Sequence, residues 1–92
     1  MVNDNQNPEW TPITFTEPNQ SAGVMGRGDY LHLEIAVKNG AVRVKLTTAD
    51  GSTRTPNETN PSISWEISDY VSFEIINNNA NGNTNLLYRL KH

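Results

Sequence analysis

At 92 residues and 10.3 kDa, the sequence has room for one domain built around one hydrophobic core. Ten acidic residues outnumber seven scattered basic ones, and the net charge of −3 argues against a nucleic-acid-binding protein, which usually carries a basic stripe. The lack of cysteine excludes disulfide scaffolds, zinc–thiolate sites and thiol catalysis. No apolar run in the sequence is long enough for a membrane-spanning helix, so no membrane span is expected.

The first third of the chain is predicted to contain little regular structure. Residues 1–10 are polar and include a proline, so we expect a loose lead-in without an intact signal peptide, followed by a single β-sandwich domain over residues 11–92. Residues 11–16 alternate weakly and contain a proline, which favours an edge strand. Residues 17–29 hold three glycines and a proline, and we expect a long loop there.

A β-hairpin is the clearest local prediction. Residues 30–38 and 41–48 both alternate apolar and polar side chains, as half-buried strands do, and Asn39-Gly40 lies between them. Asn-Gly between alternating strands predicts a type I′ turn, in which both central residues have positive φ. The register that this turn sets puts all the apolar residues on one face. The predicted pairs are Val37 with Val42, Ile35 with Val44, Leu33 with Leu46, and Glu34 with Lys45.

The second half of the sequence adds three predicted strands. Residues 62–68 and 71–76 both alternate, after a polar loop over 53–61. A two-residue turn would put their apolar sets on opposite faces, so the connection either has an odd number of residues or crosses to a second sheet. An asparagine-rich loop over 77–85 then leads to a last strand over 86–91. The residues predicted to point into the core are Ile13, Phe15, Leu31, Leu33, Ile35, Val37, Val42, Val44, Leu46, Ile63, Trp65, Ile67, Val71, Phe73, Ile75, Leu86, Tyr88 and Leu90.

The pattern of short strands predicts an all-β fold, an antiparallel β-sandwich of jelly-roll type with six to eight strands. Four stretches between Gly28 and Leu90 are informative: GDYLHLEIAV, the hairpin leading into VKLTTADGS, the later ISWEISDYVSFEIIN, and the closing YRL. In these stretches the chain resembles bacterial pre-peptidase C-terminal (PPC-type) domains and similar jelly-roll accessory domains. The resemblance implies a non-catalytic accessory module of exported proteins, associated with secretion, hydrolase attachment or surface binding.

Candidate catalytic groups are few. The chain has two histidines, His32 and the terminal His92, and no serine lies in a G-x-S-x-G motif. His32 falls at an outward strand position, where an exposed polar residue is expected, and Glu34, Glu66 and Glu74 alternate with core residues in the same way. We therefore expect no catalytic residues and no enzymatic activity.

Four residues are candidates for ligand binding: Trp10, Tyr30, His32 and Arg43. Trp10 lies outside the predicted strands and Tyr30 lies beside His32 on the outward face of the predicted hairpin, so the two aromatic rings could form a platform for a sugar. The alternative for Trp10 is packing over the end of the sandwich. Arg43 belongs to the same outward face, which is polar and suits either solvent or a protein partner. The amides of the asparagine-rich loop could also bind a glycan.

Two further motifs each have a plain structural alternative. Asp50 begins the run Asp-Gly-Ser-Thr and is a candidate for a calcium site, although Asp-Gly at a strand end usually forms a turn and the calcium-loop spacing is missing. We therefore expect no cofactor and no metal, with calcium at Asp50 as the alternative. Residues 27–29 read Arg-Gly-Asp, which in an exposed loop could present an adhesion motif, whereas loop geometry also accounts for the glycines.

These features together predict a non-catalytic binding or accessory domain of an exported or cell-surface bacterial protein, with a carbohydrate or a protein as its ligand. The alternative is a structural or assembly subunit, from a phage or a surface appendage, that self-associates through its sheets. A monomer or a small homo-oligomer is expected, with no nucleic-acid partner.

Overall fold

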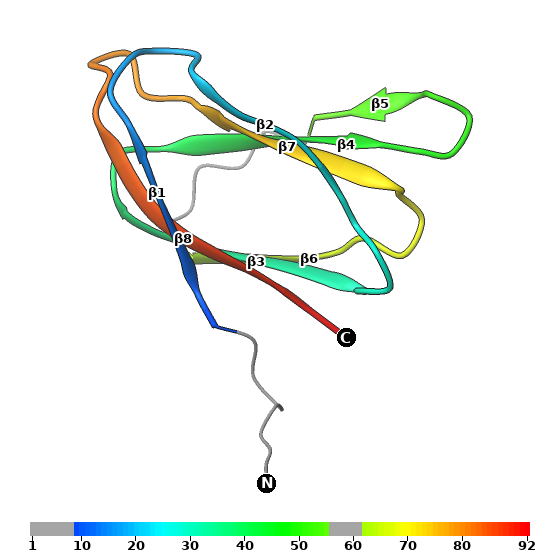
Figure 1. Ribbon diagram of the computed structural model, residues 1–92. Helices are drawn as coiled ribbons and strands as arrows, with labels where there is room; N and C mark the ends of the chain where they lie inside the picture. The colour runs from blue at the N-terminus through cyan, green and yellow to red at the C-terminus, as the bar shows by residue number, and fades with distance from the viewer. Residues whose placement is uncertain (1–8, 56–61) are drawn as a thin grey trace, which may run out of the picture.

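Eight antiparallel strands make up the part of the chain that this computed structural model describes, residues 9–55 and 62–92 (Figure 1). The strands are β1 (Thr11–Phe15), β2 (Ser21–Gly26), β3 (His32–Asn39), β4 (Val42–Thr47), β5 (Thr53–Arg54), β6 (Ser62–Glu66), β7 (Ser72–Asn77) and β8 (Thr84–Lys91). One sheet, sheet A, has the order β1-β8-β3-β6, and the other, sheet B, has the order β2-β7-β4-β5. Two strands far apart in the sequence, β1 in blue and β8 in red, lie side by side in Figure 1.

This pair of strand orders is the jelly-roll arrangement of a β-sandwich. The chain changes sheet at every connection except the one between β4 and β5. The predicted fold class is therefore confirmed: the fold is an all-β antiparallel sandwich with eight strands. Within residues 9–55 and 62–92 there is no helix, and hence no helix able to cross a membrane.

The hydrophobic core lies between the sheets, because alternate side chains of each strand point inward. Each such side chain contributes about 1.5–3 kcal/mol by its burial. Every one of the ten buried apolar residues was predicted to point inward. Leu31 and Val71 were wrongly predicted to do so: they lie just before β3 and β7 and are 41% and 47% exposed. The side chain of Ile63 lies outside the described part of the structure. The ten buried residues are Phe15, Leu33, Ile35, Val42, Val44, Leu46, Ile67, Phe73, Ile75 and Leu86.

The predicted hairpin is wrong. β3 pairs with β8 and β6 in sheet A, while β4 pairs with β7 and β5 in sheet B, so Asn39-Gly40 connects the two sheets. A type I′ turn needs positive φ at both central residues, and of these two only Gly40 has it, at +93°. The apolar faces of β3 and β4 meet across the interior of the sandwich. The alternation of apolar and polar residues fits this arrangement as well as it fits pairing within one sheet.

Two strands lie in segments that were predicted to be loops. β2 falls inside the predicted loop 17–29, where a bulge between Ser21 and Val24 and a glycine with φ of +90° interrupt the alternation. β5 has only two residues and falls inside the predicted loop 53–61. The connection from β6 to β7 crosses between sheets, as the second of the two predicted alternatives required. The lead-in predicted for residues 1–10 lies outside the described residues apart from its last two.

Candidate functional site

The outward residues of β3 and β4 lie on opposite faces of the sandwich, because the two strands belong to different sheets. His32 and Glu34 are on the outer face of sheet A, whereas Arg43 and Lys45 are on the outer face of sheet B. The predicted polar face that combined His32 with Arg43 is therefore wrong, as is the predicted pair of Glu34 with Lys45. Lys45 lies opposite Glu74 of β7 instead.

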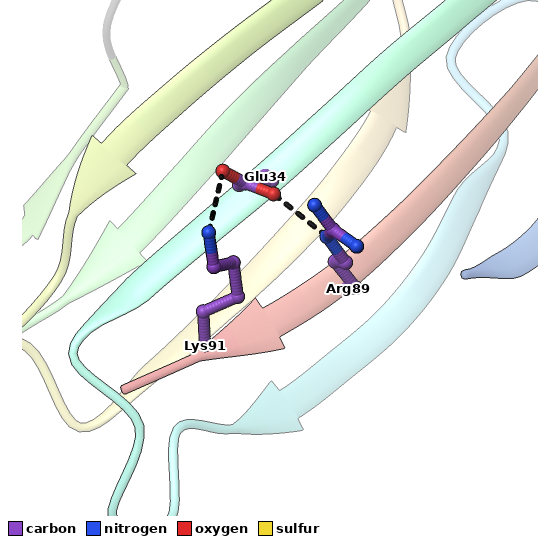
Figure 2. Close-up of polar contacts among 3 residues, drawn as sticks. All are labelled: Glu34, Arg89 and Lys91. Carbon is purple, nitrogen blue, oxygen red and sulfur yellow. Dashed lines mark hydrogen bonds and ion pairs between the residues drawn. The ribbon is translucent and has the colours of Figure 1, made fainter. Parts of the chain in front are cut away.

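Glu34 forms the centre of a charge cluster on the outer face of sheet A, with two cations from the neighbouring strand β8 (Figure 2). Arg89 Nε donates a hydrogen bond to Glu34 Oε1 at 2.7 Å, and Lys91 Nζ lies 3.5 Å from Glu34 Oε2. The hydrogen bond from Arg89 is the main cause that lowers the pKa of Glu34 below its usual 4.5. The two neighbouring cations thus keep the carboxylate ionised and balance its charge, which is a structural role.

The two aromatic candidates, Trp10 and Tyr30, have different partners. The guanidinium carbon of Arg89 lies 4.1 Å from the centroid of the Trp10 ring, so a cation occupies one face of the indole. The half-buried ring of Tyr30 lies 4.8 Å, centroid to centroid, from the ring of His92. These rings pack on the protein's own side chains, and Arg43, on the other sheet, is not part of their surroundings.

The described structure contains a pocket at the opposite end of the sandwich, where the β1–β2 loop meets the β7–β8 loop. Its volume is about 260 Å³, a little below the roughly 300–1,000 Å³ that is typical of small-molecule sites. It is therefore of a size for one small polar ligand. The residues that line it are Pro18, Asn19, Asn77, Asn78, Asn79 and Ala80.

Asn77 is the fully buried base of this pocket. Its amide nitrogen donates to the carbonyl oxygens of Glu17 at 2.8 Å and Gly82 at 2.6 Å, one in each of the two loops. Its amide oxygen accepts from Thr84 Oγ1 at 2.7 Å and from the backbone N–H of Asn79 at 3.2 Å. A buried amide with all these bonds fixes the two loops relative to each other. The pocket walls are thus preorganised.

Arg43 is not among the lining residues, but it orients two of their side-chain amides. Its Nη1 donates to Asn78 Oδ1 at 3.1 Å and to Asn19 Oδ1 at 3.4 Å. Because a guanidinium has donors and no acceptor, both amide oxygens must face Arg43, and the amide nitrogens are not used in these bonds. Asn19 holds its place in the left-handed region, at a φ of 63°, which asparagine tolerates better than most residues.

Sequence reasoning identified only part of this site. The glycan-binding potential of the asparagine-rich loop and the candidate Arg43 were both noted, but they were assigned to unrelated surfaces. Asn19 was missed because it lies in an aperiodic segment, where only the cluster of turn-forming residues Glu-Pro-Asn marks a loop.

The two remaining motifs act within the fold. The carboxylate of Asp50 accepts from Thr48 Oγ1 at 2.5 Å and from the backbone N–H of Ser52 at 2.9 Å, which lowers its pKa to about 2 and closes the turn after β4. Among the described residues no three histidine, aspartate or glutamate side chains gather as a metal site would require. In the Arg-Gly-Asp segment, Arg27 donates to the carbonyl oxygens of Tyr70 at 2.6 Å and Tyr30 at 2.7 Å. Its guanidinium therefore connects two loops.

Comparison with known proteins shows the fold. No model of a known protein family and no curated protein matches the sequence. The structure is similar to that of the SPBc2 prophage-derived protein YomS, with a TM-score of 0.64 over 97% of this chain and 98% of that one, at 9% sequence identity. A cupin domain from Bordetella pertussis Tohama I aligns with a TM-score of 0.45 over 97% of this chain and all of the other, at 13% identity. The likeness to YomS is a likeness of fold.

Proposed function

We propose that this chain is a non-catalytic binding domain and that the pocket over Asn77 holds a carbohydrate. The observation that carries the proposal is a preorganised hollow of about 260 Å³ whose wall contains four side-chain amides. Amides donate and accept hydrogen bonds, as sugar hydroxyls do, and a few well-placed polar groups suffice to orient a small ligand. The same kind of function is what the resemblance of residues 28–90 to accessory domains of exported bacterial proteins implies.

Catalysis is not part of this proposal. The residues that line the pocket are asparagine, proline and alanine, whose side chains neither exchange protons near neutral pH nor act as nucleophiles. Such a wall can hold a ligand and orient it, but it offers a bound sugar no group that would cleave a glycosidic bond.

A second candidate, a self-assembling structural subunit, is favoured by one observation. Val24 is 71% exposed on β2, the strand at one edge of sheet B. An exposed apolar residue on an edge strand favours pairing with another chain. YomS, which its name describes as prophage-derived, shares the fold. This candidate predicts a discrete oligomer at micromolar concentration, and Val24→Lys would return the oligomer to a monomer.

The test of the binding function is a glycan array probed with three proteins. The wild-type chain should bind a defined set of glycans, Asn78→Ala should lose at least about tenfold in affinity, and Asn83→Ala should bind as the wild type does. Asn83 is the matched control because it is exposed on the same loop and does not line the pocket. Equal binding by Asn78→Ala and the wild type, or a wild-type chain that binds no glycan, would overturn the proposal.

A further inference from the structure

The side-chain amides that line the pocket offer a ligand hydrogen-bond donors rather than acceptors. Arg43 engages the amide oxygens of Asn19 and Asn78, which leaves the two amide nitrogens free of the guanidinium. Within the described part of the chain, neither nitrogen donates a hydrogen bond to the protein. Two N–H₂ groups of residues that line the pocket are therefore available to donate to a ligand.

The other two amides that line the pocket, those of Asn77 and Asn79, add no free acceptor. Asn77 is fully bonded at both ends, as described above. Asn79 donates from its amide nitrogen to the carbonyl oxygen of Asn83 at 2.6 Å and accepts at its amide oxygen from the backbone N–H of Asn81 at 3.0 Å. The side-chain oxygens of Asn19, Asn77, Asn78 and Asn79 thus all accept hydrogen bonds from the protein, so the amide groups that remain for a ligand are donors.

The charge near the pocket also favours an anionic ligand. No carboxylate is among the lining residues, and the Arg43 guanidinium, which is hydrogen-bonded to Asn19 and Asn78, carries a full positive charge. Hydrogen bonds from such amides to an ionised acceptor are shorter and stronger than those to a neutral hydroxyl. The guanidinium also polarises the amides in the sense that strengthens their N–H groups as donors.

Resting on the proposed carbohydrate function, we infer that the pocket selects a carboxylate-bearing sugar, a uronic acid, over the neutral sugar of the same ring. The carboxylate accepts hydrogen bonds from the amide nitrogens of Asn19 and Asn78, and the Arg43 charge favours the anion without direct contact. The pocket volume limits the recognised unit to a small group such as one sugar ring.

The test compares methyl glucuronide with methyl glucoside, which differ in a carboxylate against a hydroxymethyl group, by isothermal titration calorimetry. The wild-type chain should bind the glucuronide at least about tenfold more tightly, and Arg43→Met should reduce this preference to less than about threefold. Lys45→Met is the matched control, because it removes a cation two residues along the same strand and should keep the wild-type preference. Arg43→Lys retains the charge and should keep part of the preference, which guards against misfolding of Arg43→Met.

The outcomes separate the inference from the proposed function. A wild-type chain that binds both sugars equally keeps the binding function and overturns the acidic-sugar inference. A chain that binds neither sugar, nor any glycan of the array, overturns both. Sodium acetate that competes as well as the glucuronide shows a simple anion site and overturns the assignment to a sugar, as does a preference that survives in Arg43→Met but is lost in Lys45→Met.

Discussion

Gly40 packs directly against Thr84: a Cβ atom built on Gly40 would clash with Thr84 Oγ1. Thr84 is itself buried and donates to the amide oxygen of Asn77 at the base of the pocket. The connection from β3 to β4 therefore packs against the start of β8. Gly40, which the sequence predicts to lie in a hairpin turn, instead allows the chain to cross between the two sheets beside the base of the candidate site.

We expect Gly40→Ala to lower the free energy of unfolding by about 3 kcal/mol or more. Positive φ costs a non-glycine residue about 1–2 kcal/mol, and the clash with Thr84 adds the cost of a backbone shift. Gly51→Ala is the control, because Gly51 has the same φ of +93° and a Cβ atom added there would meet nothing within 4 Å. Urea denaturation of both variants measures the difference, and equal losses would contradict the packing described.

Asn77→Ala is expected to lose about 2–4 kcal/mol of unfolding free energy. The substitution removes the hydrogen bonds of the Asn77 amide to the Glu17 and Gly82 carbonyl oxygens and to the Thr84 hydroxyl, all in or near the core. Asn83→Ala, on the exposed part of the same loop, should stay within about 0.5 kcal/mol of the wild type. Thermal unfolding followed by circular dichroism ranks the two, and an Asn77→Ala chain as stable as Asn83→Ala would rule out the anchoring role.

The ion pairs of Glu34 should make stability depend on pH in the acid range. Because the folded-state pKa of Glu34 lies below its unfolded value, the stabilisation is fully present above the usual 4.5 and is lost as pH falls through the lowered folded pKa. Glu34→Gln removes this dependence and costs about 0.2–1 kcal/mol at neutral pH. Arg89→Gln removes the main cause, so carbon-13 NMR should show the Glu34 carboxyl titrating at higher pH than in the wild type. An unchanged midpoint would count against Arg89 as the cause.

Arg27→Met is expected to lose about 1.5–3 kcal/mol of unfolding free energy. Methionine keeps much of the apolar stem but gives up both hydrogen bonds to the backbone of the loops at Tyr30 and Tyr70. Asp29→Asn, in the same Arg-Gly-Asp segment, removes an exposed charge and should change stability by less than about 0.5 kcal/mol. If Asp29→Asn proved the more harmful of the two in guanidinium denaturation, the loop-connecting role of Arg27 would be refuted.

The core was predictable because a period of two assigns each side chain to a face, and burial of Leu33, Val44 and Phe73 requires only that their faces point inward. The pairing of strands was not predictable in the same way. Alternation in β3 and β4 is equally consistent with pairing in one sheet and with facing across a sandwich. It therefore does not identify which strands are hydrogen-bonded to each other. The misleading Asn-Gly signal comes from Gly40, whose positive φ serves the crossing between sheets.

The candidate site was harder to predict than the core for a related reason. Its wall comes from two loops that are about 60 residues apart in the sequence, as the bond from Asn77 to Glu17 shows. Loops have no periodicity that would say which of them meet. Arg43 could be recognised as outward from its strand pattern, but only the jelly-roll topology brings it beside Asn19 and Asn78.

The most direct measurement for the carbohydrate pocket is a nitrogen-15 NMR spectrum recorded while methyl glucuronide is added. Binding at the pocket should move the side-chain amide signals of Asn19 and Asn78 and leave the indole N–H of Trp10, which lies at the other end of sheet A, in place. A shift of the Trp10 signal with Asn19 and Asn78 unmoved would contradict the account and place the sugar on the outer face of sheet A.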